Sequence, residues 1–164
     1  MASAIGLAVR ALVWTAGAIA TLLLLSSLVI TVYAVVMRYV FNAPLLWSDE
    51  LTGYLLVALV MLGAAEAYRK GDHIGVDLLS SKAKGGLKRL LAGFAHVAVL
   101  AVSVVIGYSA WESVLFARAF GSFSPGALEI ETWIPQAPMI LGAALLGVTA
   151  LARLLGLLKA PDAP

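Results

Sequence analysis

Cysteine is absent from the sequence, and charged residues are scarce. Without thiols the chain cannot form a disulfide framework, a thiolate metal site or a dithiol redox pair. Only 12% of its residues are charged, against about a quarter in soluble domains. His96 is the only histidine inside an apolar run, so a bis-histidine haem would lack its second ligand. These absences argue against a soluble domain and against a membrane redox enzyme.

Long uncharged hydrophobic runs dominate what is present, since 62% of the residues are hydrophobic. A helix needs about 20 apolar residues to cross a bilayer. We predict four transmembrane spans, at about residues 11–37, 47–68, 90–111 and 132–152. The second span is uncharged only over 51–65, so a re-entrant or interfacial segment is its alternative. The fold class expected is therefore an all-α integral membrane protein, with residues 1–164 forming a single four-helix transmembrane domain.

The distribution of Lys and Arg predicts the orientation of these spans. Alternate hydrophilic segments carry nine basic residues on one side of the membrane and two on the other. The nine are Arg10, Arg69, Lys70, Lys82, Lys84, Lys88, Arg89, Arg153 and Lys159, and the two are Arg38 and Arg118. Because basic loops stay in the cytoplasm, both termini and the second loop are expected there. A short interfacial helix is expected within that loop, near residues 74–81.

Three charged residues near the ends of the first two spans form the strongest candidate constellation. Arg38 ends the first span, and Asp49 and Glu50 begin the second, with a short connection between them. A charge near hydrocarbon is costly without a partner, so we expect Arg38 to pair with Glu50 or Asp49. The structural interpretation is a clamp between two helices, and the functional alternative is a proton or ion site. Ser48 is expected to cap the second helix.

The remaining polar residues predict local pairs rather than chemistry. Glu66 precedes Arg69 and Lys70 by three and four residues, the spacing at which helix side chains meet. His73 and Asp77 are similarly spaced in the cytoplasmic loop, but two ligands do not make a metal site. No catalytic, cofactor-binding or metal-binding residue is therefore predicted. No basic patch with interleaved aromatic residues suggests nucleic acid, and the lipid bilayer is the partner that composition predicts.

Three segments resemble a known family. Residues 38–42 read Arg-Tyr-Val-Phe-Asn and 47–50 read Trp-Ser-Asp-Glu, while 71–77 read Gly-Asp-His-Ile-Gly-Val-Asp. Together with 127–133 and the residues beyond them, these segments are similar to the small membrane subunit of TRAP (tripartite ATP-independent periplasmic) transporters, the DctQ-like subunit. The similarity covers residues 37–147.

This resemblance implies a non-catalytic scaffold subunit of a sodium-driven importer of small organic acids in the bacterial inner membrane. Its implied partners are a large multi-span permease subunit, which carries the substrate and sodium sites, and a periplasmic substrate-binding protein that the small subunit helps to dock. The resemblance implies that Arg38, Asn42, Trp47 and Glu50 organise the periplasmic end of the first two helices. It implies that His73 and Asp77 order the cytoplasmic loop.

The competing reading from the residues is a stand-alone small transporter or channel. That reading requires an ionisable residue deep within a span and facing a cavity, and the first span has none.

Overall fold

The computed structural model describes residues 2–70 and 86–159, which form four long helices. These are α1 (Ala2–Tyr39), α2 (Ser48–Lys70), α4 (Gly86–Ala119) and α5 (Trp133–Lys159). Each contains a stretch long and apolar enough to cross a membrane. The prediction of an all-helical chain with four apolar helices is thereby confirmed. The interfacial helix expected near 74–81 lies outside the described residues, and the sidedness of the termini stays a prediction.

Helix α4, which corresponds to the third predicted span, extends well beyond its predicted end. The third was predicted to end near residue 111, but α4 continues to Ala119. Residues 112–119 contain neither glycine nor proline, so nothing in the sequence interrupts the helix there. Gly121, with a φ of 57°, then turns the chain out of the helix. The third connection is therefore 120–132, shorter than expected, and its arms meet in an isolated bridge between Phe123 and Glu131.

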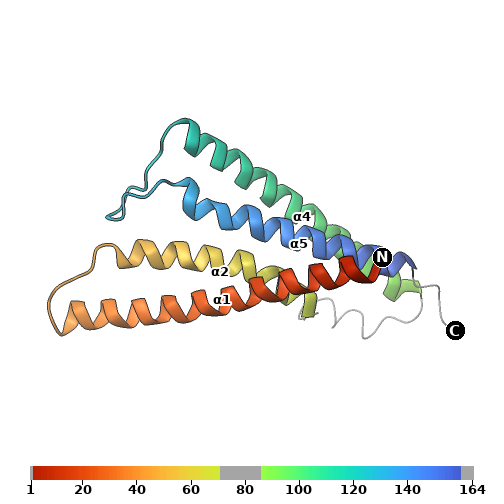
Figure 1. Cartoon of the computed structure of the whole chain (residues 1–164), viewed down its shortest axis with the longest axis horizontal. Coiled ribbons are helices and arrows are strands. Elements are labelled where there is room, and N and C mark those ends of the chain that lie inside the picture. Colours follow the sequence, from red (N-terminus) through yellow and green to blue (C-terminus); the bar gives the residue numbers. More distant parts are fainter. Residues whose placement is uncertain (1, 71–85, 160–164) are drawn as a thin grey trace.

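The helices lie in a row in the order α1, α2, α5, α4 (Figure 1). Two antiparallel hairpins, α1–α2 and α4–α5, meet along α2 and α5, and α1 makes a minor contact with α5. Among the described residues, the backbone of α4 approaches neither α1 nor α2. Residues 40–47 and 120–132 connect the helices at one end, called here the loop end. α1 begins and α5 ends at the opposite end, called here the termini end.

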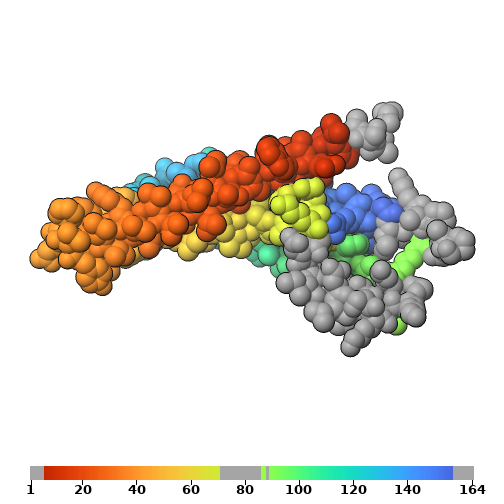
Figure 2. All heavy atoms as spheres, turned by 90° about the horizontal axis from the view of Figure 1, so that it is seen from below, coloured from red at the N-terminus to blue at the C-terminus, as the bar shows by residue number. Residues whose placement is uncertain are grey.

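Small side chains fill the seams between these helices. The buried apolar residues are mostly alanines, such as Ala16, Ala58, Ala110 and Ala150. Large side chains point outward instead, and Leu28, Phe94 and Val104 are 60%, 72% and 62% exposed. Figure 2, which is turned by 90° from Figure 1, shows α1 uncovered along most of its length. This arrangement suits lipid, where burying large apolar side chains gains little and close backbone packing holds helices together.

Glycines allow the closest approaches within the row. A Cβ atom on Gly142 of α5 would lie 2.4 Å from the carbonyl oxygen of Met61 on α2. On the other side of α5, Gly147 lies against the Ser103 hydroxyl of α4. Ala143 of α5 likewise lies against Gly107 of α4. The small residues at 143 and 147 therefore serve packing within the chain.

We expect Gly142→Ala to weaken the contact between the two hairpins. The added methyl group has no space against the backbone of α2, so the free energy of unfolding should fall by about 1–3 kcal/mol. Thermal unfolding of the purified chain in detergent measures this change. Gly53→Ala is the matched control, because a Cβ there would meet nothing within 4 Å. Equal behaviour of the two variants would contradict the proposed importance of this contact.

Candidate functional site

At the loop end, Arg38 pairs with Asp49 and not with Glu50. Nη2 of Arg38 lies 3.5 Å from Oδ2 of Asp49, which links the end of α1 to the first turn of α2. The two side chains are 48% and 81% exposed, so this ion pair is a weak surface contact. A groove of about 320 Å³ opens between the same two helices, with Arg38 and Asp49 among its lining residues.

Glu50 has a different role, because its carboxylate reaches the third connection, residues 120–132. Oε2 accepts a hydrogen bond of 3.1 Å from the backbone N–H of Leu128, and Oε1 accepts one of 2.9 Å from the Tyr54 hydroxyl. A Cβ on Gly126 would lie 2.1 Å from Oε2, so only glycine permits this approach. Glu50 on α2 therefore holds the connection between α4 and α5, a contact between residues 78 positions apart.

Hydrogen bonds within the connection 120–132 also hold its two arms together. The N–H of Ser124 donates to the carbonyl of Ile130, and the N–H and hydroxyl of Thr132 both donate to the carbonyl of Ser122. The guanidinium of Arg118 lies 4.9 Å from the ring centroid of Trp133, whose indole N–H donates to Glu131. Residues 120–132 are thus a closed loop, fastened to α2 through Glu50.

The other predicted residues of the loop end shape the first connection. Asn42 has a φ of 51°, in the left-handed region that asparagine tolerates in turns. The half-buried Trp47 supplies the carbonyl that accepts the first helical hydrogen bond, from the N–H of Leu51. The expectation that Ser48 caps α2 was wrong. Its buried hydroxyl instead donates to the carbonyl of Leu45, so it bonds the preceding turn.

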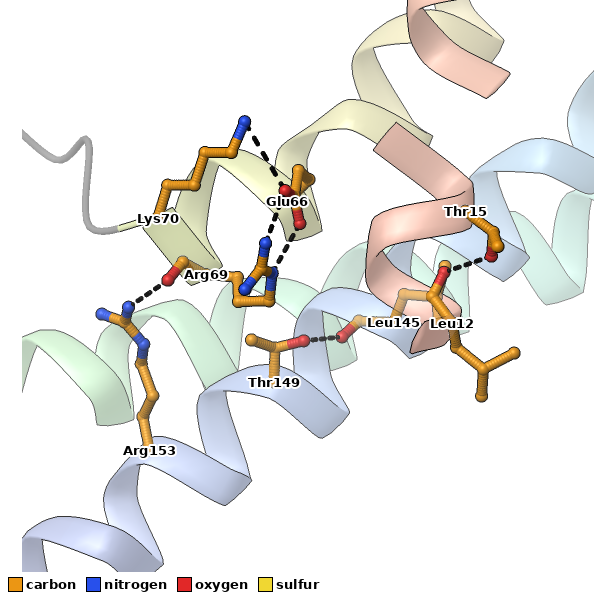
Figure 3. Close-up of polar contacts among 8 residues, drawn as sticks. All are labelled: Leu12, Thr15, Glu66, Arg69, Lys70, Leu145, Thr149 and Arg153. Atoms are coloured by element: carbon orange, nitrogen blue, oxygen red, sulfur yellow. Dashed lines mark hydrogen bonds and ion pairs between the residues drawn. The ribbon is translucent and has the colours of Figure 1, made fainter. Parts of the chain in front are cut away.

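At the termini end, Glu66 is buried and paired with its neighbours on α2, as its spacing predicted (Figure 3). Arg69 donates to it through Nε and Nη2 at 2.6 and 2.7 Å, and Nζ of Lys70 lies 3.6 Å away. The aliphatic part of Glu66 packs on Gly17 of α1, where a Cβ would lie 2.7 Å from Cγ of Glu66. The carboxylate is therefore neutralised within α2 while its stem holds α1.

Arg153 extends this cluster to the second hairpin. Its Nη2 donates to the carbonyl of Arg69, one of the last carbonyls of α2, at 2.6 Å (Figure 3). Its guanidinium also lies 5.0 Å from the ring centroid of Tyr68. The Tyr68 hydroxyl is 2.5 Å from Nδ1 of His96 on α4, a hydrogen bond whose donor depends on the imidazole tautomer. Side chains here join α2, α5 and α4.

These long-range contacts have no signal in the amino-acid sequence. Arg153 and Arg69 are separated by 84 residues, and Tyr68 and His96 by 28. His73 and Asp77, which were predicted to order the second loop, lie outside the described residues. Within residues 2–70 and 86–159, no group of three or more His, Asp or Glu residues is arranged to hold a metal ion. The cluster around Glu50 at the loop end positions the loop 120–132, and the cluster around Glu66 and Arg153 at the termini end positions the helices.

We expect Gly126→Ala and Glu50→Gln to loosen the loop 120–132. The added methyl group displaces the carboxylate, with a destabilisation of about 1–3 kcal/mol, and the amide weakens the charge-assisted bond to Leu128. Hydrogen exchange of the amides in 120–132 should be faster in both variants. Asp49→Asn is the control, because Asp49 contacts Arg38 instead. An equal effect of Asp49→Asn would show that general charge loss, and not the Glu50 contact, orders the loop.

Comparison with known proteins identifies the family. The family described as "Tripartite ATP-independent periplasmic transporters, DctQ component" matches residues 27–160. The C4-dicarboxylate TRAP transporter small permease protein DctQ of Vibrio cholerae is 36% identical over 77 residues, covering 47% of this chain and 33% of that protein. The sialic acid TRAP transporter small permease protein SiaQ of Vibrio cholerae is 30% identical over 74 residues, 43% of each chain.

A longer protein also matches. The sialic acid TRAP transporter permease protein SiaT of Haemophilus influenzae is 33% identical over 70 residues, covering 43% of this chain and 11% of SiaT. The matches thus span less than half the length of these three relatives.

The family match extends over most of the chain and includes both of the clusters described above. It confirms the expected class, a non-enzymatic transmembrane component of a TRAP transporter in the inner membrane. The chain therefore belongs to the DctQ family, the small permease component of TRAP transporters.

Proposed function

We propose that this chain is the scaffold of a sodium-driven TRAP importer, with the substrate and sodium sites in a large permease subunit. The shape of the chain is the observation that carries this proposal. A row one helix thick has seams filled by small side chains and leaves large apolar side chains on its faces. Transport of an ionic substrate needs a polar path through the membrane, usually with ionisable residues facing a cavity. Among the described residues, charged side chains lie only toward the helix ends.

The relatives suggest the partners and the class of substrate. The two small permease proteins are named for C4-dicarboxylates and for sialic acid, which are both small organic acids. In SiaT the matching segment is only 11% of a much longer permease protein, which supports close association between such a segment and a large permease. We expect a large multi-span permease subunit on one face of the row and a periplasmic binding protein at its loop end.

The distribution of charge supports one orientation of the chain in the membrane. Within the described residues, the loop end carries Arg38 and Arg118, whereas the termini end carries Arg10, Arg69, Lys70, Arg89 and Arg153. The positive-inside rule then places the termini end in the cytoplasm and the loop end in the periplasm. In this orientation Glu50 orders the loop that faces the binding protein. His73 and Asp77 would order the cytoplasmic loop.

The proposed orientation is open to a direct test, because the chain has no cysteine of its own. Phe41→Cys and Leu7→Cys each place one thiol on a residue that is 65% and 73% exposed, respectively. In intact spheroplasts a membrane-impermeant maleimide should label position 41, while position 7 should react only after permeabilisation. The reverse pattern would overturn the proposed sidedness.

The scaffold role predicts that the chain does not transport alone. A tagged chain extracted in mild detergent should co-purify with a larger multi-span protein, and vesicles containing only the chain should show no sodium-driven uptake of dicarboxylates or sialic acid. Vesicles that transport with this chain alone would support the alternative, a stand-alone small transporter or channel. So would complete loss of uptake in Arg38→Ala or Glu50→Ala variants that still assemble with the larger protein, because a clamp is expected to be partly dispensable once assembled.

A further inference from the structure

A groove of about 390 Å³ lies between α1 and α2 at the termini end. Small residues form much of its wall, among them Gly17, Ala18 and Ala20 on α1 and Gly63 on α2, while Glu66 and Lys70 lie at one end. The Thr21 hydroxyl also lines it but donates to the carbonyl of Gly17 in its own helix. The wall therefore offers little to a polar ligand and suits an apolar chain.

The length of the groove corresponds to one leaflet of a bilayer. On α2 its lining residues run from Lys70, the last residue of the helix, to Leu59. The eleven steps from one residue to the next, at about 1.5 Å each, give about 16 Å, close to half of the roughly 30 Å hydrocarbon core. A groove of this length accommodates one acyl chain, which extends through a single leaflet.

The charge at the groove mouth favours an anionic headgroup. Arg69 already engages both oxygens of Glu66 at 2.6 and 2.7 Å, and Lys70 is the more distant partner at 3.6 Å. The Lys70 side chain is 60% exposed, so its ammonium keeps donors available for another acceptor. The cluster contains three basic side chains, those of Arg69, Lys70 and Arg153, and one acidic side chain, that of Glu66, so its net charge is positive. Basic pockets between membrane helices bind anionic lipid headgroups in this way.

We infer that this groove binds one anionic phospholipid, whose phosphate contacts Lys70 and one of whose acyl chains lies along the small residues between α1 and α2. Trp14, which is 62% exposed and lines the same groove, flanks the lipid near the headgroup region. The bound lipid fills a seam that the protein leaves open. The inference does not depend on the proposed transport role, because it concerns a surface within this chain.

Native mass spectrometry tests the inference on the full-length chain, together with its permease partner where the two co-purify. The probes are phosphatidylglycerol and phosphatidylcholine with identical dioleoyl chains. We expect one phosphatidylglycerol to be retained in preference to phosphatidylcholine. Ala18→Phe, which fills the groove from an exposed position, should abolish this retention, and Ala98→Phe, at an exposed alanine of α4, should not.

A second pair of variants tests the headgroup contact. Lys70→Gln should weaken retention of phosphatidylglycerol about fivefold, the factor that corresponds to losing one basic residue near an anionic surface. Lys70→Arg should preserve it. Equal retention of the two lipids, or wild-type retention by Ala18→Phe, would overturn the inference. So would efficient cross-linking of an Ala18→Cys thiol to the permease, because a protein helix would then occupy the groove.

Discussion

The close approach of α2 and α5 is the contact on which the rest of the row depends, because it is the main junction between the two hairpins. In water, two hairpins would be driven together by burial of large apolar side chains. In lipid this driving force is largely missing, and association relies on backbones that come close enough for van der Waals contact. Because Gly142 of α5 has no side chain, the backbone carbonyl of Met61 on α2 can lie directly against the backbone of α5. The positions of α1 and α4 on the outside of the row follow from this central pair.

Different polar contacts stabilise the two ends of the row. At the loop end one carboxylate, that of Glu50, accepts a hydrogen bond from the backbone of a distant loop. At the termini end the buried carboxylate of Glu66 is paired with Arg69 and Lys70, and Arg153 donates to a backbone carbonyl of α2. Both arrangements satisfy groups that would otherwise be left without partners near hydrocarbon. The middle of the membrane, where such groups would be most costly, is left to small apolar residues.

Much of this fold was predictable because it is local. Uncharged runs located the helices, and the spacing of Glu66 and Arg69 predicted their ion pair. The pairing of Arg38 was narrowed to two acidic residues, of which Asp49 is the partner. The order of the helices was not predictable, because helices that are apolar on all sides carry no periodic pattern to show which face meets which neighbour. The bond from Leu128 to Glu50 was missed for a related reason, since a backbone donor has no sequence signature.

The distribution of large and small side chains has a consequence for how such a sequence can change over time. Leucine, valine and phenylalanine on the faces meet a fluid neighbour, and exchange among them alters little as long as the surface stays apolar. The seams have no such freedom, because one added methyl group meets a neighbouring backbone. Substitutions should therefore accumulate at the large lipid-facing residues, while the glycines and alanines in the seams should change little.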